Sequence, residues 1–99
     1  MEVSDGAPGN GVLKRDFVIT NQYGIHARPA AMIVKAASRF DADFTVEKDG
    51  NRVSGKSIMG LMTLEASRGS RISVTVEGPD GQALLDELQR LFEAGFDEE

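Results

Sequence analysis

Residues 20–31 read Thr-Asn-Gln-Tyr-Gly-Ile-His-Ala-Arg-Pro-Ala-Ala and hold the only histidine of the 99-residue chain. Pro29 is tolerated in the first turn of a helix but not deeper, so a helix should begin within a residue or two of Arg28. His26 then lies near a helix N-terminus, where unpaired N–H groups and the helix dipole favour an anion. Imidazole can act as base, ligand or nucleophile near neutral pH, and a guanidinium fits phosphate oxygens. The stretch therefore predicts a nucleophile beside an anion site.

The segments on either side of this stretch have different hydrophobic periods. Before it, residues 14–20 alternate between apolar and polar side chains, with Arg15 as the interruption, and predict a strand. Gly24 closes the turn that follows and can take a positive φ. From about Ala27 to Arg39, apolar residues recur at helical spacing and predict an amphipathic helix.

The rest of the chain predicts three more strands and two more helices. The elements expected are strands at 43–47 and 52–54 joined by Asp49-Gly50-Asn51, a short helix from Ser57 to about Leu64, a strand at 72–76, and a helix over 84–92 that Gly95 ends. The Ser57 hydroxyl can cap the short helix by accepting from an N–H of its first turn.

The apolar stripes of all these elements can be buried together in one arrangement, a half-apolar antiparallel sheet with helices stacked on one face. We therefore predict an α+β fold, a two-layer open-faced sandwich with a four-stranded antiparallel sheet and three helices on one face, in the order β-α-β-β-α-β-α. Residues 13–99 should form this single domain. Residues 1–12 contain three glycines and few large apolar side chains, and we expect a flexible leader there.

Composition excludes several classes of function. The formal net charge is -5, and five of the sixteen acids lie near the chain ends: Glu2, Asp5, Asp97, Glu98 and Glu99. The remaining eleven acids balance eleven Lys and Arg, so nucleic-acid binding is not expected. The chain has no cysteine and one histidine, which argues against a thiolate or imidazole-rich metal site, and no bound cofactor is expected. Without a signal peptide or an apolar span, we expect a cytoplasmic protein with no membrane insertion.

Two strings of sequence carry a family resemblance. Residues 24–30, Gly-Ile-His-Ala-Arg-Pro-Ala, resemble the phosphorylation site of HPr, the histidine phosphocarrier of the bacterial phosphoenolpyruvate-dependent phosphotransferase system. Residues 56–62, Lys-Ser-Ile-Met-Gly-Leu-Met, are similar to the regulatory serine segment of the same family and follow at about the family's spacing. The resemblance extends from about Leu13 to the C-terminus and implies the strand order 1-4-2-3.

The resemblance implies a role for the residues around the histidine. His26 would be phosphorylated on Nδ1 by Enzyme I, with phosphoenolpyruvate as the source, and would pass the group to a histidine of an enzyme IIA domain for sugar uptake. Arg28 would stabilise the phosphoryl charge, and the N–H groups of Ala27 and Arg28 would cradle it. Because the phosphorylated ring nitrogen keeps a reactive P–N bond, the protein would be a carrier and not an enzyme in its own right. A monomer is expected for such a transient carrier.

The resemblance also implies regulation and docking at the second string. An HPr kinase/phosphorylase would modify Ser57, which would place nearly two negative charges beside the docking surface. Ile58, Met59 and Met62 are expected to form that exposed surface, and Leu61 and Leu64 to be buried. Tyr23 is expected mainly to pack against its own turn.

The branch of the family stays open at this point. Residues 77–79, Glu-Gly-Pro, and the ending Gly95-Phe96-Asp97-Glu98-Glu99 look like NPr, the carrier of the nitrogen-related branch. The serine segment favours the carbohydrate branch with catabolite regulation.

Two hypotheses of other classes also remain. A non-catalytic interaction domain on the same fold would make His26 incidental, because α+β sandwiches host many functions. A metal-dependent hydrolase is a weaker hypothesis, since the carboxylates Asp41, Asp43, Glu47 and Asp49 form no recognisable ligand pattern.

Overall fold

The computed structural model describes residues 12–97 of the chain. The expected leader therefore lies outside the described residues, apart from Val12, which is the first residue of strand β1 (Val12–Val18). Glu98 and Glu99 of the acidic ending also lie outside them.

The sheet has four antiparallel strands in the order β1-β4-β2-β3, which confirms the expected topology. Its other strands are β2 (Asp43–Lys48), β3 (Asn51–Ser54) and β4 (Arg71–Glu77). Phe17 of β1 pairs with Ile72 of the central strand β4, and Val46 of β2 pairs with Val74. These apolar side chains are buried on one face, as the alternation predicted.

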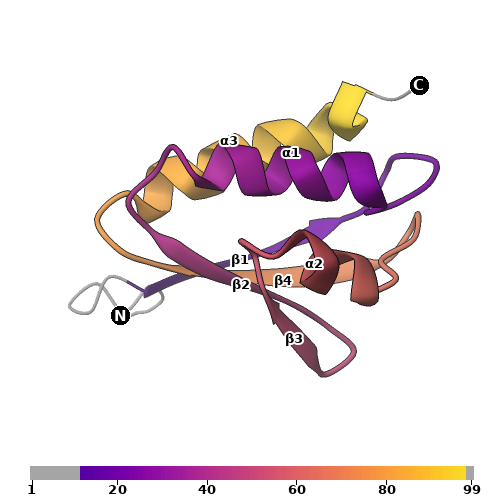
Figure 1. Cartoon of the computed structure of the whole chain (residues 1–99), viewed down its shortest axis with the longest axis horizontal. Coiled ribbons are helices and arrows are strands. Elements are labelled where there is room, and N and C mark those ends of the chain that lie inside the picture. The colour runs from indigo at the N-terminus through magenta and orange to yellow at the C-terminus, as the bar shows by residue number, and fades with distance from the viewer. Residues whose placement is uncertain (1–11, 98–99) are drawn as a thin grey trace.

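Three helices accompany the sheet: α1 (Ala27–Ala37), α2 (Ile58–Thr63) and α3 (Gly81–Glu93). Figure 1 shows α1 and α3 side by side over one face of the sheet. The short helix α2 packs against α1 and β3, at the end of the molecule where α1 begins. The predicted open-faced α+β sandwich is confirmed.

Element boundaries differ from the predictions by up to three residues, the most at α3, which begins at Gly81 and not at Leu84. The strand expected at 14–20 runs from Val12 to Val18. The helix expected to reach Arg39 ends at Ala37, because the N–H of Arg39 donates to the carbonyl of Ala36 (3.1 Å) in a tightened last turn.

Arg15, which interrupts the apolar set of β1, lies at the open edge between the sheet and α3. Its Nη1 donates to Gln89 Oε1 at 2.7 Å and approaches Asp86 Oδ1 at 3.4 Å. The side chain therefore lies along the edge of the core with its charge paired, and it does not enter the core.

One short element after α3 was not predicted from the sequence. Gly95 ends α3 with a φ of +60°, as expected, but a 3-10 turn η3 (Gly95–Asp97) follows. Phe96 in this turn is fully buried, and its ring packs edge-to-face on Phe92 with centroids 5.1 Å apart. Phe92 in turn stacks on Phe17 of β1 with ring centroids 4.8 Å apart, so Phe96 is part of the core.

Candidate functional site

His26 is the residue immediately before α1, and it occupies the N-cap position. Its backbone is extended, with φ -97° and ψ -163°, and its side chain makes no capping hydrogen bond to the helix. The side chain is half-buried. The prediction that a helix begins within two residues of Arg28 is confirmed.

The first turn of α1 presents backbone donors beside this histidine. Ala27 and Arg28 are its first two residues, so their N–H groups have no acceptor within the helix. Pro29 has no N–H, and the first helical hydrogen bond runs from the N–H of Ala30 to the carbonyl of His26 at 2.9 Å. The first turn contains no acidic residue to oppose an anion at this end of the dipole.

The turn before His26 is held by the segment that connects α2 to β4. The N–H of Ile25 donates to the Ala66 carbonyl at 2.9 Å. Gly24 has a φ of +67°, and a Cβ there would lie 2.2 Å from the Ala66 oxygen, so glycine is required. Within the turn, buried Asn21 donates from Nδ2 to the Gly24 carbonyl at 2.8 Å. Residues far apart in the sequence thus fix the backbone that carries the histidine.

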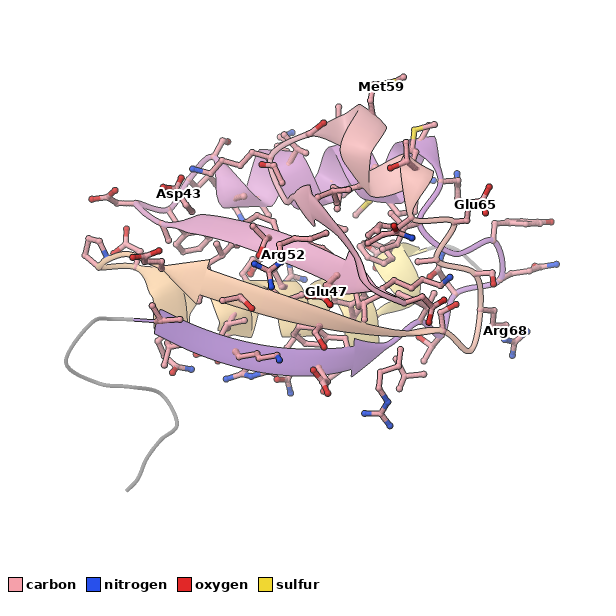
Figure 2. All side chains as sticks on the ribbon, turned by 90° about the horizontal axis from the view of Figure 1, so that it is seen from below. Asp43, Glu47, Arg52, Met59, Glu65 and Arg68 are labelled. Atoms are coloured by element: carbon pink, nitrogen blue, oxygen red, sulfur yellow. The ribbon has the colours of Figure 1, made fainter. Side chains whose placement is uncertain are left out.

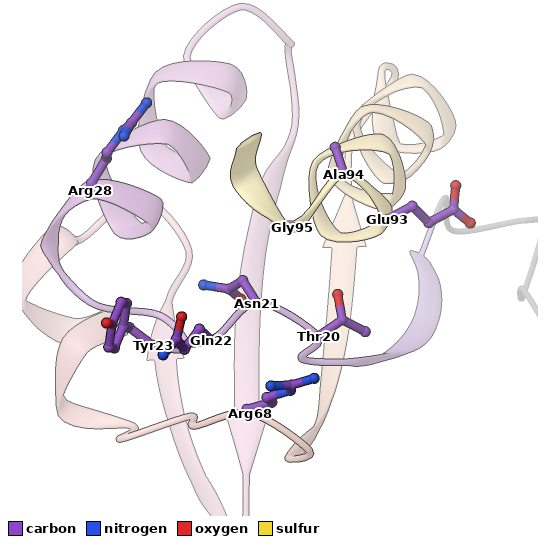
Figure 3. A pocket seen from close by; sticks show the side chains of 9 residues that line it. All are labelled: Thr20, Asn21, Gln22, Tyr23, Arg28, Arg68, Glu93, Ala94 and Gly95. Atoms are coloured by element: carbon purple, nitrogen blue, oxygen red, sulfur yellow. The ribbon is translucent and has the colours of Figure 1, made fainter. Parts of the chain in front are cut away.

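A hollow of about 580 Å³ lies beside this turn (Figure 3). It is lined by the turn residues Thr20, Asn21, Gln22 and Tyr23, by Arg28 and Arg68, and by Glu93, Ala94 and Gly95. Within residues 12–97, neither Arg28 nor Arg68 takes part in an ion pair. Both guanidinium groups can therefore meet an anion or an acidic partner.

Ser57 caps α2 as predicted. Its Oγ accepts from the N–H of Gly60 at 2.9 Å, and its backbone is extended, with φ -115°. The hydroxyl is therefore part of the local fold as well as the expected modification site.

The helix that Ser57 begins has one buried and one exposed side. Leu61 and Leu64 are buried, as expected from the resemblance. The exposed fractions are 40% for Ile58, 72% for Met59 and 38% for Met62. Figure 2 shows Met59 projecting away from the body of the molecule. These three residues, the α2 patch, lie on a helix that packs against α1.

Three of the four carboxylates considered for a hydrolase are held in ion pairs. Asp43 pairs with Lys56 at 3.2 Å, and Glu47 pairs with Arg52 at 3.2 Å across the open face of the sheet (Figure 2). Asp49 pairs with its neighbour Lys48. In the described part of the chain, no group of three His, Cys, Asp or Glu side chains could hold a metal ion. No described helix has the length and apolar composition needed to cross a membrane.

Two residues near the site were not foreseen in these roles. The sequence pattern predicts only that Arg68 lies in a turn before β4. It gives no sign that this turn lies beside the turn at residues 20–23. Tyr23 was expected to pack against its turn, yet its side chain is 68% exposed, and its ring lies edge-to-face with His26.

The arrangement suits the transient handling of an anionic group. An imidazole stands at a helix N-terminus beside two N–H donors that have no acceptor within the helix, and a guanidinium follows two residues later. The site is at the surface, so two different macromolecules can reach the same ring in turn.

Comparison with known proteins gives the same family from sequence and from structure. The family model described as PTS HPr component phosphorylation site matches residues 13–94. Phosphocarrier protein HPr of Treponema pallidum is 51% identical over 81 residues, which cover 82% of this chain and 92% of the relative.

Solved structures show the same likeness. The crystal structure of HPr-C-His from Thermoanaerobacter tengcongensis is similar with a TM-score of 0.82 and 42% identity, over 87% of this chain and 97% of that one. An HPr dimer from the same organism is similar with a TM-score of 0.70 and 43% identity, over 83% and 94% of the two chains.

Proposed function

The chain belongs to the HPr family of phosphocarrier proteins of the phosphotransferase system, and on that premise we propose that His26 is the residue that carries the phosphoryl group. A member of this family is a component of the system and not an enzyme in its own right. The observation that carries the proposal is the position of His26 at the N-cap of α1, with Arg28 in the first turn.

The proposed cycle has two transfers at one ring nitrogen. Nδ1 of His26 attacks the phosphoryl group carried by Enzyme I, which derives from phosphoenolpyruvate, and a P–N bond forms as the donor's bond to phosphorus breaks. A histidine of an enzyme IIA domain then attacks the same phosphorus, and His26 leaves as imidazole. Each transfer is an in-line displacement in which positioning and charge stabilisation carry most of the catalysis.

The residues around His26 divide the stabilisation between them. The N–H groups of Ala27 and Arg28 would donate to phosphoryl oxygens, and the Arg28 guanidinium would add a positive charge. Arg28 is exposed, so its charge is partly screened and it can follow the phosphoryl group as partners change.

The α2 patch is the proposed docking surface for both Enzyme I and the IIA domain. Met59 and its neighbours are exposed apolar side chains on a helix that packs against α1, and Met adapts to surfaces of different shape. Exchange of the phosphoryl group with these partners would take place in the cytoplasm. A monomer would be sufficient for it. Mass measurement in solution tests the monomer, since one similar structure is a dimer.

Ser57 is the proposed site of regulation by an HPr kinase/phosphorylase. A phosphate on Oγ would stand at the start of α2, directly beside Ile58 and Met59. The charge would oppose an apolar contact there, so docking would weaken. This serine segment, together with a relative named phosphocarrier protein HPr, supports the carbohydrate branch and sugar uptake over the NPr-type alternative. A mass gain of one phosphate with the kinase and ATP, absent in Ser57→Ala, tests the modification.

The phosphocarrier proposal is tested with purified Enzyme I, Mg²⁺ and phosphoenolpyruvate. We expect intact mass to rise by one acid-labile phosphate in the wild type and not in His26→Ala. Arg28→Ala should still accept the group, with transfer slowed about 10- to 100-fold, less than for a donor in an enclosed site. Arg52→Ala, which removes a cation on β3, is the matched control and should transfer normally.

Circular dichroism must show that each variant is folded, so that a loss of transfer can be attributed to the substituted side chain. Full transfer by folded His26→Ala would overturn the proposal. It would restore the interaction-domain hypothesis, in which partners bind equally well without His26.

A further inference from the structure

Tyr23 is a large aromatic side chain that the proposed cycle does not use. It is 68% exposed, although burial is what stabilises most aromatic side chains. Its ring nevertheless contacts one neighbour in a defined geometry. The Tyr23 and His26 ring centroids are 6.1 Å apart with planes at 87°, an edge-to-face pair.

The backbone beneath Tyr23 is held in place, so this contact is not that of a loose loop. Its neighbour Gly24 is clamped against the Ala66 carbonyl, and the N–H of Gly24 donates to the carbonyl of Asn21 at 3.3 Å. The N–H of His26 donates to the Gly24 carbonyl at 3.1 Å, so the two ring-bearing residues are joined through one tight turn. The Tyr23 side chain, labelled in Figure 3, therefore projects from a fixed turn, and its ring lies edge-to-face with the imidazole of His26.

The orientation of the imidazole ring matters for phosphoryl transfer, and a neighbouring ring can restrain it. The outer torsion of a histidine side chain is broad and roughly two-fold, so rotation about it is weakly restricted by the residue itself. In-line transfer requires one particular ring nitrogen to face the incoming phosphorus, and small misplacements are costly.

We propose that Tyr23 is a positioning residue, whose ring holds the His26 imidazole in the orientation that presents its nucleophilic nitrogen to the phosphoryl donor. The proposal rests on the phosphoryl-carrying role of His26. It acts through the ring contact and not through the phenol hydroxyl. An edge-to-face pair has an interaction energy that corresponds to about a two- to tenfold effect on an equilibrium or a rate.

The chain offers an unusually direct first measurement, because Tyr23 is its only tyrosine and His26 its only histidine. Two-dimensional NMR of the unphosphorylated protein should show cross-relaxation between the tyrosine and imidazole ring protons. Tyr23→Leu should shift the imidazole proton resonances, whereas Tyr23→Phe should leave them close to the wild-type positions. Val18→Ala is the control, since Val18 is another exposed large apolar residue, on β1.

The second measurement is single-turnover transfer from phosphorylated Enzyme I over a range of donor concentrations. Tyr23→Leu should lower the saturating rate about two- to tenfold with an unchanged half-saturation concentration, and Tyr23→Phe should restore the wild-type rate. Val18→Ala should transfer normally, and thermal unfolding should show all variants equally folded.

Three results would overturn the proposal. The first is a raised half-saturation concentration with an unchanged saturating rate in Tyr23→Leu, which would assign Tyr23 to partner docking. The others are a Tyr23→Phe variant as slow as Tyr23→Leu, and the absence of ring cross-relaxation in the wild type. Failure of the proposed function is distinguishable. In that case the wild type gains no phosphate at His26, while the NMR arm still reports whether the two rings are in contact.

Discussion

Ser57 joins folding and regulation at a single hydroxyl. Its Oγ accepts the hydrogen bond that begins α2, and the same oxygen is the proposed phosphate acceptor. A carboxylate or phosphate at an N-cap is compatible with the helix dipole, so a negative charge there need not unfold α2. The consequence of modification should therefore appear in docking and not in stability.

Substitutions at Ser57 separate these two effects. Ser57→Ala should lower the free energy of unfolding by about 1 kcal/mol, because the N–H of Gly60 loses its acceptor. Ser57→Asp should retain nearly the wild-type stability, since Asp is an equally good N-cap, but should raise the half-saturation concentration for Enzyme I. Urea denaturation and transfer kinetics measure the two quantities. Equal docking by Ser57→Asp and the wild type would leave Ser57 as a cap alone.

The connection between α2 and β4 is the element that supports the histidine turn, and it contains a strained residue. Glu65 follows the C-cap Leu64 and has a φ of +53°. This is the left-handed region, where residues other than glycine are disfavoured. The next residue is Ala66, whose carbonyl accepts from Ile25. The strain thus lies one residue from the contact that holds the turn.

Relieving this strain should stabilise the protein. Glu65→Gly should raise the free energy of unfolding by about 1 kcal/mol, measured by urea denaturation, because glycine adopts this φ without steric cost. Glu65→Ala is the matched control, since it removes the same charge and keeps the strain, and it should give no such gain. Equal gains in both variants would attribute the effect to the charge and not to φ.

At the scale of the whole molecule, one carboxylate ties the two long helices together over the sheet. Glu87 of α3 accepts from Arg90 at 2.6 Å and from Arg39, just beyond the end of α1, at 3.2 Å. The hydrogen bond from Arg90 is the largest cause that holds the pKa of Glu87 below its ordinary value of 4.5, and the charges of Arg90 and Arg39 add to it against desolvation. Its side chain is only 18% exposed.

This lowered pKa makes part of the stability depend on pH. A carboxyl with a lower pKa in the folded state contributes fully above its unfolded pKa and loses the contribution as pH falls through the folded value. Glu87→Gln should therefore lower the free energy of unfolding at pH 7 by about 0.5–1 kcal/mol, and the difference should shrink as pH falls below the ordinary carboxyl range.

Urea denaturation at a series of pH values checks this prediction. Glu93→Gln, which alters a carboxylate on the same helix that no described cation pairs with, should show a smaller effect. A deficit in Glu87→Gln that persists unchanged in acid would mean that packing, and not the ionised carboxylate, is responsible.

The elements and the start of α1 could be predicted because their causes are local. Pro29 restricts where a helix can begin, and this predicts that His26 lies near a helix N-terminus. The hairpin at Asp49 and Gly50 was equally readable, since both residues take the positive φ values that a two-residue turn requires. The strand order 1-4-2-3, by contrast, came from the family resemblance, because pattern does not say which strands become neighbours.

By itself the sequence determined the order and type of the four strands and three α-helices and the pairing of a histidine with a helix N-terminus, whereas the exposed and buried sides of α2 came from the family resemblance. Only the tertiary structure decided that Ala66 holds the histidine turn, that Arg68 lines the hollow beside it, that Phe96 completes the core and that the Tyr23 ring meets His26. The physical reason is the distance along the chain over which each effect acts. Periodicity, capping and turn chemistry act over a few residues, whereas these contacts depend on how the packed sheet and helices bring distant or freely rotating groups together.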